Sequence, residues 1–241
     1  MPRADLHVHT RYSPDCASAS LKLVARCLER GLDCIAITDH NTIEGALETR
    51  EIAPFTVIVG EEVTTTGGDI IGLFLREEVP SGLSPLEAVQ CIKEQGGLVS
   101  IPHPFDRFRS SVIRPDPLSQ VLPHVDIIET FNARNVLGRA DRKAAEMASR
   151  HNIAACSVSD AHTIHELGRT YVAMPEFDGT AQGFLTALRQ GTLVCHRSNP
   201  LVHAASSLFK LRRRPARTDP STHLTSEDGE PSNAIRGGPG G

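Results

Sequence analysis

Five histidines of this 241-residue sequence stand where short apolar segments end. Several of them have a carboxylate or a second histidine one or two positions away. The five are His7, His9, His40, His103 and His162. Imidazole nitrogens and carboxylate oxygens are ligands for borderline and hard divalent cations. No cysteine accompanies them in a C-x-x-C pair, so the residue types predict a site for zinc, manganese or iron, with magnesium also allowed, and not a thiolate zinc site.

Two pairs of these candidate ligands are separated by a single residue. His7 and His9 stand at the end of the predicted strand Asp5–Val8, and Asp160 and His162 follow the predicted strand Ile153–Val158. Because side chains alternate between the two faces of a strand, residues two apart project to the same side. Each pair is therefore expected to present two ligands to one metal site.

Other predicted strands end in acidic residues or histidine as well, in Thr38-Asp39-His40, Gly60-Glu61-Glu62 and Pro102-His103-Pro104. The candidate ligands are His7, His9, Asp15, His40, Glu62, His103, Asp160 and His162. Four ligands complete one zinc site, so this set predicts at least two ions that share a bridging carboxylate. Clusters of this kind supply hydroxide near neutral pH and stabilise the oxygens of an in-line phosphoryl displacement, which predicts phosphoester hydrolysis.

The elements that position these residues alternate between strands and helices. The expected strands are Asp5–Val8, Cys34–Thr38, Phe55–Val63, Asp69–Leu75, Gly97–Ile101, Val125–Glu129, Ile153–Val158, Thr170–Met174 and Leu193–Cys195. Helical periodicity covers Ser20–Arg30, Pro85–Gln95, Leu137–Arg150 and Ala181–Gln190, with Ser84 as an N-cap and Gly31, Gly96 and Gly191 as left-handed C-terminal caps. This alternation predicts a mainly parallel α/β fold, either a doubly wound sheet or a closed barrel, with its site at the carboxyl ends of the strands.

Composition limits the partners of the chain. Its net charge is −4, and aromatic residues make up 4% with no tryptophan, which counts against sequence-independent nucleic-acid binding and against base stacking. The sequence has no secretory signal pattern and no apolar run long enough to span a membrane, so we predict a cytoplasmic protein without a membrane partner.

The chain is expected to divide into three parts. Residues 1–200 carry the strands, helices and candidate ligands. Residues 201–217 form a basic helix or extension, which is interpreted as a solvated helix end or as a site for nucleic acid or acidic lipid. Residues 218–241 contain almost nothing to bury and are predicted to be a disordered tail.

The ordered motifs resemble those of the PHP (polymerase and histidinol phosphatase) family of metal-dependent phosphoesterases. The resemblance runs from residue 5 to about residue 200 and rests on His7-x-His9, Asp15, Thr38-Asp39-His40, Gly60-Glu61-Glu62, Pro102-His103-Pro104 and Asp160-x-His162. It implies a distorted seven-stranded (βα) barrel that holds two or three divalent ions. It therefore favours the barrel over the open sheet.

The resemblance also implies how the ligands divide among three ions. The first ion takes His7, His9, Glu62 and Asp160; the second shares Glu62 and adds His103; the third takes Asp15, His40 and His162. Glu62 is preferred to Glu61 because the family pattern is Gly-x-Glu.

Asp69 stands where members of the family often carry a histidine, before Ile70-Ile71-Gly72. It either binds the second ion through oxygen, which favours manganese, iron or magnesium, or caps the Gly67-Gly68 turn.

The phosphate contacts are expected to come from arginine, which matches the geometry of phosphate with two parallel hydrogen bonds. Arg134 is the first candidate, and Arg107 and Arg109 are the second. His165 is a candidate for a supporting role beside His162, while His124, His151, His196, His203 and His223 have no partner pattern.

Three functions are open at this point. The leading one is an enzyme that hydrolyses small phosphomonoesters, of nucleotide type or generic, with hydroxide supplied by a di- or trinuclear metal cluster. The second is a phosphodiesterase or exonuclease acting on short oligonucleotides. The third is a non-catalytic metal-binding regulatory module, although a module of that kind would be expected to have lost ligands.

Overall fold

The computed structural model describes residues 1–199. The predicted basic extension at 201–217 and the predicted tail at 218–241 lie outside the described residues. Within residues 1–199, no helix is both long and apolar enough to cross a lipid bilayer.

Nine strands form one sheet, in the order β7-β6-β5-β4-β3-β2-β1-β8-β9. The strands are β1 (Arg3–Val8), β2 (Cys34–Ile37), β3 (Thr56–Thr65), β4 (Gly68–Leu73), β5 (Leu98–Ile101), β6 (Ile127–Asn132), β7 (Ala154–Val158), β8 (Tyr171–Ala173) and β9 (Thr192–Val194). The helices are α1 (Ser20–Arg30), α2 (Glu44–Ile52), α3 (Pro85–Glu94), α4 (Pro115–Val121), the 3-10 turn η1 (Leu122–His124), α5 (Gly138–His151) and α6 (Ala181–Arg189). All nine predicted strands occur within a few residues of their predicted ends. The short helices α2 and α4 were not predicted.

Two of the three glycine caps follow the prediction. Gly31 ends α1 in the left-handed region, and Gly96 has a positive φ just after α3. Gly191 does not have a positive φ, so the prediction of a left-handed cap at this residue is wrong. A left-handed cap that was not predicted is formed at the end of α5 by Asn152, at φ 53°.

The sheet is mixed, which corrects the expectation of a mainly parallel fold. Strands β1, β2 and β3 are parallel neighbours, as are β5, β6 and β7. β4 runs antiparallel to both β3 and β5, and β8 runs antiparallel to β1 and β9. Only two residues separate β3 from β4, a connection too short for the crossover helix that parallel strands need.

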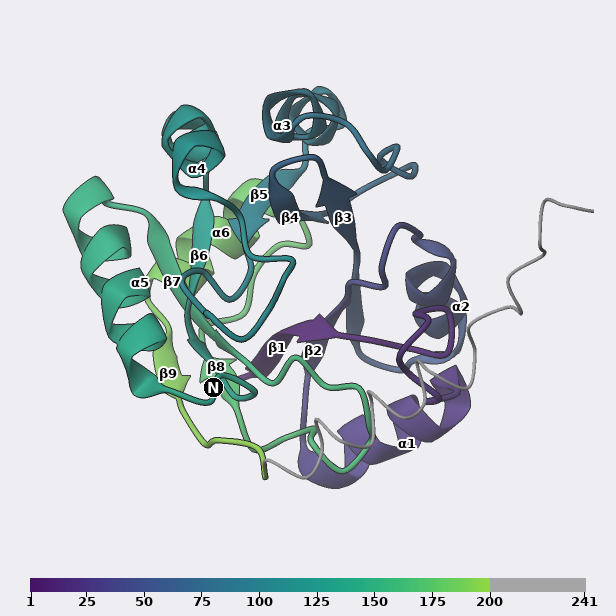
Figure 1. The fold of residues 1–241 in the computed structure, drawn as a ribbon. Helices are drawn as coiled ribbons and strands as arrows, with labels where there is room; N and C mark the ends of the chain where they lie inside the picture. The colour runs from purple at the N-terminus through teal and green to yellow at the C-terminus, as the bar shows by residue number, and fades with distance from the viewer. Residues whose placement is uncertain (200–241) are drawn as a thin grey trace, which may run out of the picture.

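The sheet curves into a nearly closed barrel with helices α1 to α5 around its outside (Figure 1). The ends of the barrel sheet meet where Val8 pairs in parallel with Ala161, just after β7. The amide of His9 donates to the carbonyl of Ala161 (3.0 Å), and the amide of Ala161 donates to the carbonyl of His7 (3.3 Å). The barrel expectation is thus confirmed, and β8 and β9 extend the sheet beyond the seven strands that the family resemblance implied.

A shift in register in β1 turns His7 toward the barrel interior. The pairing of β1 with β2 is irregular between Asp5 and Val8. Leu6 belongs to the apolar cluster inside the strands, whereas Val8 packs in the cluster that faces the helices, although residues two apart in a regular strand share a face. The extra residue therefore allows Leu6 and His7 both to face inward, as β-bulges do beside functional sites.

The inner apolar cluster leaves one end of the barrel for the polar site. It combines residues near the beginnings of several strands, among them Ala4, Leu98 and Ile127, with Phe184 and Leu188 of α6. α6 lies behind the ring of strands in Figure 1. The opposite end, where the parallel strands finish, holds the predicted ligands.

Candidate metal centre

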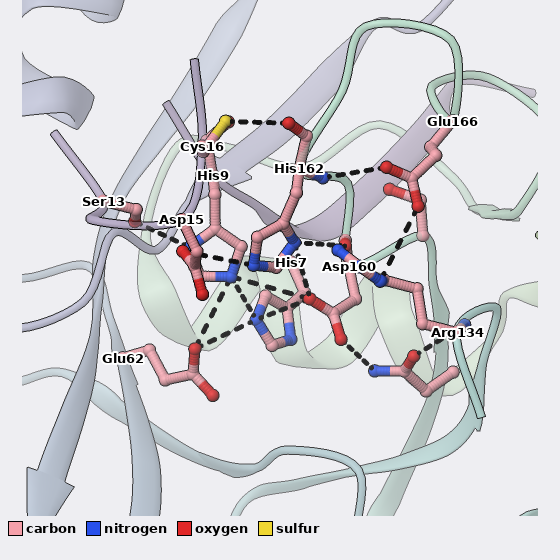
Figure 2. A network of polar contacts seen from close by, with 12 residues as sticks. His7, His9, Ser13, Asp15, Cys16, Glu62, Arg134, Asp160, His162 and Glu166 are labelled. Carbon is pink, nitrogen blue, oxygen red and sulfur yellow. Dashed lines mark hydrogen bonds and ion pairs between the residues drawn. The ribbon is translucent and has the colours of Figure 1, made fainter. Parts of the chain in front are cut away.

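Four predicted ligand atoms converge at this end of the barrel (Figure 2). Nε2 of His7 and Nε2 of His9 are 2.9 Å apart, and Glu62 Oε2 lies 3.4 and 3.5 Å from them. Asp160 Oδ1 is 3.6 Å from each nitrogen and has no hydrogen-bond partner among the described residues although it is buried. Ligand bonds of about 2.0–2.1 Å place the corners of a tetrahedron about 3.3 Å apart. His7, His9 and Glu62 thus offer three ligand atoms at about the spacing of ligands to one ion, and Asp160 Oδ1 lies at a similar distance from both histidine nitrogens.

Glu62 also reaches the residues predicted for the neighbouring ions. Its Oε1 lies 3.0 Å from Nε2 of His103, and its Oε2 lies 3.1 Å from Nδ1 of His40. The adjacent Glu61 turns to the other face of the strand, where it accepts the amide hydrogen of Val79 at 2.8 Å. Glu62, and not Glu61, therefore faces the cluster and contacts residues from all three predicted groups.

Asp69 lies beside the second group of ligands. Its carboxylate is buried and lines the cavity into which the ligand cluster opens. It offers an oxygen within 4.8 Å of ligand atoms of His40 and Glu62. The Gly67–Gly68 turn is closed by Thr65, whose hydroxyl accepts the Gly67 amide hydrogen at 3.1 Å and donates to the Gly68 carbonyl. The position of Asp69 therefore fits a ligand better than a turn cap.

The third predicted group is also brought together. Asp15 Oδ1 lies 3.4 Å from Nε2 of His162, and its Oδ2 lies 3.5 Å from Nε2 of His40. His9, His40 and His162 each offer a nitrogen within 4.8 Å of the others, so the three groups form one continuous cluster.

The electrostatics of the cluster hold some ligands in the form that binds cations and leave protons on others. The neighbouring carboxylates outweigh burial and raise the pKa of His7 well above its ordinary value and that of His40 to about 9, so a cation would displace protons from these two rings. Burial, together with the neighbouring His162 and His40, holds the pKa of His9 well below its ordinary value, so His9 is neutral. Burial raises the pKa of Glu62, but the charges of His40 and His7 outweigh it and hold that pKa well below its usual range. Neutral imidazole and ionised carboxylate are the ligating species.

Glu129, within β6, supports two of the ligands, a role that was not predicted. Its Oε1 lies 2.6 Å from Nδ1 of His7, and its Oε2 accepts the backbone amide hydrogen of His103 at 2.7 Å. Asn132 donates to the same Oε2 at 2.9 Å and to Asp160 Oδ2 at 3.1 Å. The signal was present in the sequence, because Glu129 follows a short apolar run, as Glu61 and Glu62 do.

A second support holds His9 from the opposite side. Nδ1 of His9 lies 2.9 Å from the hydroxyl oxygen of Ser13, which donates to the buried Asp39 at 2.7 Å. The amide of Thr10 also donates to Asp39, at 2.6 Å. A Cβ atom at Gly45 would lie 2.0 Å from Asp39 Oδ2, so this close approach requires glycine.

Cys16 links the two loops that carry His9 and His162. Its sulfur lies 3.3 Å from the carbonyl oxygen of His9 and 3.1 Å from that of His162. Burial raises the pKa of the Cys16 thiol to about 11, so it stays protonated and can donate to these carbonyls.

The cluster opens into a cavity of about 910 Å³, and two of the three predicted arginines line it. Arg109 donates to Asp160 Oδ2 at 2.5 Å. Arg134 is buried, with Nε 3.8 Å from Glu166 Oε1 and Nη1 3.5 Å from the carbonyl oxygen of Asp160. Arg107 is exposed and lines a separate small pocket, so the structure does not bring it to the cluster.

The supporting role expected of His165 falls to the next residue. His165 is exposed, whereas Glu166 is buried and accepts the backbone amide hydrogen of His162 at 3.1 Å. Glu166 therefore connects His162 to Arg134.

Comparison with known proteins identifies the family. The sequence matches the PHP domain over residues 5–94 and the PHP-associated domain over residues 138–193. An uncharacterised protein of Methanocaldococcus jannaschii, MJ0417, is 34% identical over 211 residues, which cover 86% of this chain and 85% of that protein. The chain belongs to the PHP family.

Two further similarities concern this PHP protein. A second uncharacterised protein of Methanocaldococcus jannaschii, MJ1587, is 44% identical over 144 residues, which cover 54% of this chain and 82% of that protein. A two-domain protein from Bacteroides vulgatus, containing a predicted PHP-like metal-dependent phosphoesterase, superposes with a TM-score of 0.66 at 20% identity. The match covers 81% of this chain and 65% of the two-domain protein, so it shows the fold.

Proposed function

We propose that this PHP protein hydrolyses small phosphomonoesters, of nucleotide type or generic, with two or three divalent ions held by its histidines and carboxylates. The observation that carries the proposal is the group of ligand atoms from His7, His9 and Glu62, with Asp160 Oδ1 3.6 Å from both histidine nitrogens, beside two arginines that line the cavity. When bound, such ions polarise a phosphoryl oxygen and lower the pKa of a coordinated water molecule.

The protein's own contribution is to hold the ligating side chains in fixed orientations. Glu129 fixes the ring of His7, and Ser13 fixes the ring of His9, through the ring nitrogens that face away from the cluster. Partners of this kind set the tautomer and orientation of a ligating histidine. The ligand set is therefore organised before a cation arrives.

Arg134 and Arg109 are proposed to bind the phosphoryl group. Arg134 is oriented by Glu166, and Arg109 by Asp106 and Asp160. A phosphate in the cavity would offer oxygens to guanidinium groups that already lie beside the cluster. Hydrogen bonds from arginine to phosphate are charge-assisted and can be bidentate, so they would hold the ester in place and stabilise the charge that develops on its oxygens.

The mouth of the cavity supports a small ester with an apolar or aromatic leaving group. Phe108 is 66% exposed and Val136 is 51% exposed, and both line the cavity. A cavity of this size is typical for a small molecule. This favours a mononucleotide or aryl ester over a polynucleotide.

The experiment that tests the proposal is a substrate panel with Mn²⁺. We expect an aryl phosphate and a mononucleotide to be hydrolysed, and the corresponding diester and a short single-stranded oligonucleotide to be turned over at least tenfold more slowly. Faster turnover of the oligonucleotide would replace the proposal with a nuclease. No turnover of any ester, with metal bound, would favour a regulatory module.

A further inference from the structure

The segment that follows β9 contacts the loop that carries Arg134, although the two are about 60 residues apart in sequence. Arg197 Nη1 donates to the carbonyl oxygen of Asn135 at 2.6 Å and to that of Asn132 at 3.3 Å. The next amide, that of Ser198, donates to the carbonyl oxygen of Ala133 at 2.9 Å. Three of the four carbonyls of the loop at 132–135 are therefore bound by two consecutive residues.

The other half of the Arg197 guanidinium is held as firmly. Nη2 forms an ion pair with Asp141 Oδ2, and the guanidinium lies 4.8 Å from the centre of the Phe131 ring. Asp141 Oδ1 in turn accepts from the side-chain amide of Asn135 at 2.7 Å. Arg197 thus joins the end of β6, its loop and the start of α5.

The segment itself is anchored on its other side. His196 donates its amide hydrogen to the Thr170 hydroxyl oxygen at 3.1 Å, and that hydroxyl donates to the His196 carbonyl at 2.6 Å. This pair of bonds fixes the backbone next to Arg197. The guanidinium therefore has a fixed base from which to hold the loop.

The loop that Arg197 holds presents two side chains to the proposed site. Arg134 lines the cavity, and its backbone amide donates to the side chain of Asn132 at 2.9 Å. Asn132 also donates to Asp160 and Glu129 at the cluster. A change in the path of this loop would move Arg134 directly, and displacements of about 1 Å can cost up to about a hundredfold in rate.

We propose that Arg197 is a positioning residue that fixes the loop at 132–135, so that Arg134 meets the phosphoryl group of the substrate. Arg197 does not line the cavity and acts through the loop backbone. Nη1 of the planar arginine fork serves two carbonyls while Nη2 serves a carboxylate, whereas lysine carries all its donors on one nitrogen. The inference about the substrate rests on the proposed phosphatase function, whereas the inference about the loop does not.

The test compares Arg197→Gln and Arg197→Lys with the wild-type protein and with Arg189→Gln. Arg189 is a matched control, because it also donates to a backbone carbonyl, that of Asn152, but lies at the end of α6 and not in the cavity lining. Three quantities are measured on the Mn²⁺-loaded 241-residue protein: hydrogen exchange of the amides at 131–137, the Kd for inorganic phosphate, and KM and kcat for an aryl phosphate.

Both Arg197 variants are expected to exchange the loop amides at least tenfold faster and to raise the phosphate Kd and the KM about tenfold, with a smaller change in kcat. Their metal content and the control variant are expected to match the wild-type protein. Wild-type loop exchange and wild-type KM in Arg197→Gln would overturn the proposal, as would loss of metal in step with activity. Should Arg197→Gln fail to fold, Asp141→Asn, which weakens the same ion pair, is expected to give a smaller shift in the same direction, and no shift would overturn the proposal.

These readouts separate the two inferences. If the wild-type protein hydrolyses no phosphate ester, the proposed function fails, while loop exchange and phosphate affinity still report on Arg197. If the wild-type protein is active but Arg197→Gln behaves like Arg189→Gln, the positioning role alone fails.

Discussion

The carboxylate of Glu129 lies 2.6 Å from Nδ1 of His7, on the opposite side of the ring from the nitrogen that faces His9, Glu62 and Asp160. This relationship makes His7 Nε2 the available ligand atom and fixes the plane of its ring. Because Glu129 also holds the amide of His103, one buried carboxylate organises ligands from two strand ends.

We expect Glu129→Gln to weaken metal binding about 10- to 100-fold, since a partner that orients a ligating histidine typically contributes that much. Isothermal titration of metal-free protein with Mn²⁺ or Zn²⁺ measures the change. Glu94→Gln, an exposed substitution at the end of α3, is the control. Equal affinities in Glu129→Gln and the control would contradict the role assigned to Glu129.

Asp69→Asn is expected to change stability in opposite directions with and without metal. Burial and the charge of Glu62 raise the pKa of Asp69, so in the metal-free protein the neutral amide removes a repulsion and stabilises the fold by about 1 kcal/mol. With metal present, loss of an anionic ligand lowers both the stability and the number of ions bound. Chemical unfolding and metal analysis, each with and without Mn²⁺, test this prediction. A change of the same sign in both conditions would contradict a ligand role for Asp69.

The pH dependence of stability has an identifiable contribution from Asp5. Burial raises the pKa of Asp5 to about 7, although its carboxylate accepts the amide hydrogen of Ser159. Between its unfolded pKa near 4 and pH 7 the folded protein holds a proton that the unfolded chain has released, so this contribution to stability falls as pH rises through that window.

We therefore expect Asp5→Asn, which is uncharged at every pH, to match the wild-type protein at pH 4–5 and to be more stable by a few kcal/mol at pH 8. Urea unfolding of the metal-free proteins at the two pH values measures the difference. A difference that does not change with pH would show that Asp5 is already ionised in the fold at low pH.

Phe108 offers a test of the leaving-group site. Because its ring is exposed at the cavity mouth, Phe108→Ser is expected to raise KM about three- to tenfold for an aryl phosphate and to leave KM for glycerol phosphate nearly unchanged. Steady-state kinetics with the two esters provide the comparison. An equal effect on both would mean that Phe108 shapes the loop and does not contact the leaving group.

Much of the site could be predicted because its ligands follow apolar strand segments in order. Asp160 and His162, for example, come directly after β7, and the closure between Val8 and Ala161 brings them to His7 and His9. The strands themselves were readable from short apolar runs bounded by glycine, proline and polar residues. Periodicity therefore located both the elements and the edge of the sheet where the ligands meet.

What could not be predicted depends on contacts between distant residues. The bulge in β1 changes which side chains face inward, and strict alternation in the sequence does not show it. The antiparallel β4 follows from a two-residue turn that joins strands otherwise typical of a βα repeat. Arg107 and Arg109 are equivalent in the sequence, and only the path of their loop separates the exposed one from the one that contacts Asp160.

The cluster at His7, His9, Glu62 and Asp160 is expected to hold the ions on which phosphoester hydrolysis depends. The most direct measurement is the Mn²⁺-dependent hydrolysis of an aryl phosphate by chelator-treated protein, for the wild type, His9→Ala, Asp160→Ala and the exposed control His151→Ala. We predict that metal restores activity to the wild type and His151→Ala, and that His9→Ala and Asp160→Ala remain at least about a hundredfold slower. Full activity of His9→Ala or Asp160→Ala with metal supplied would contradict this account.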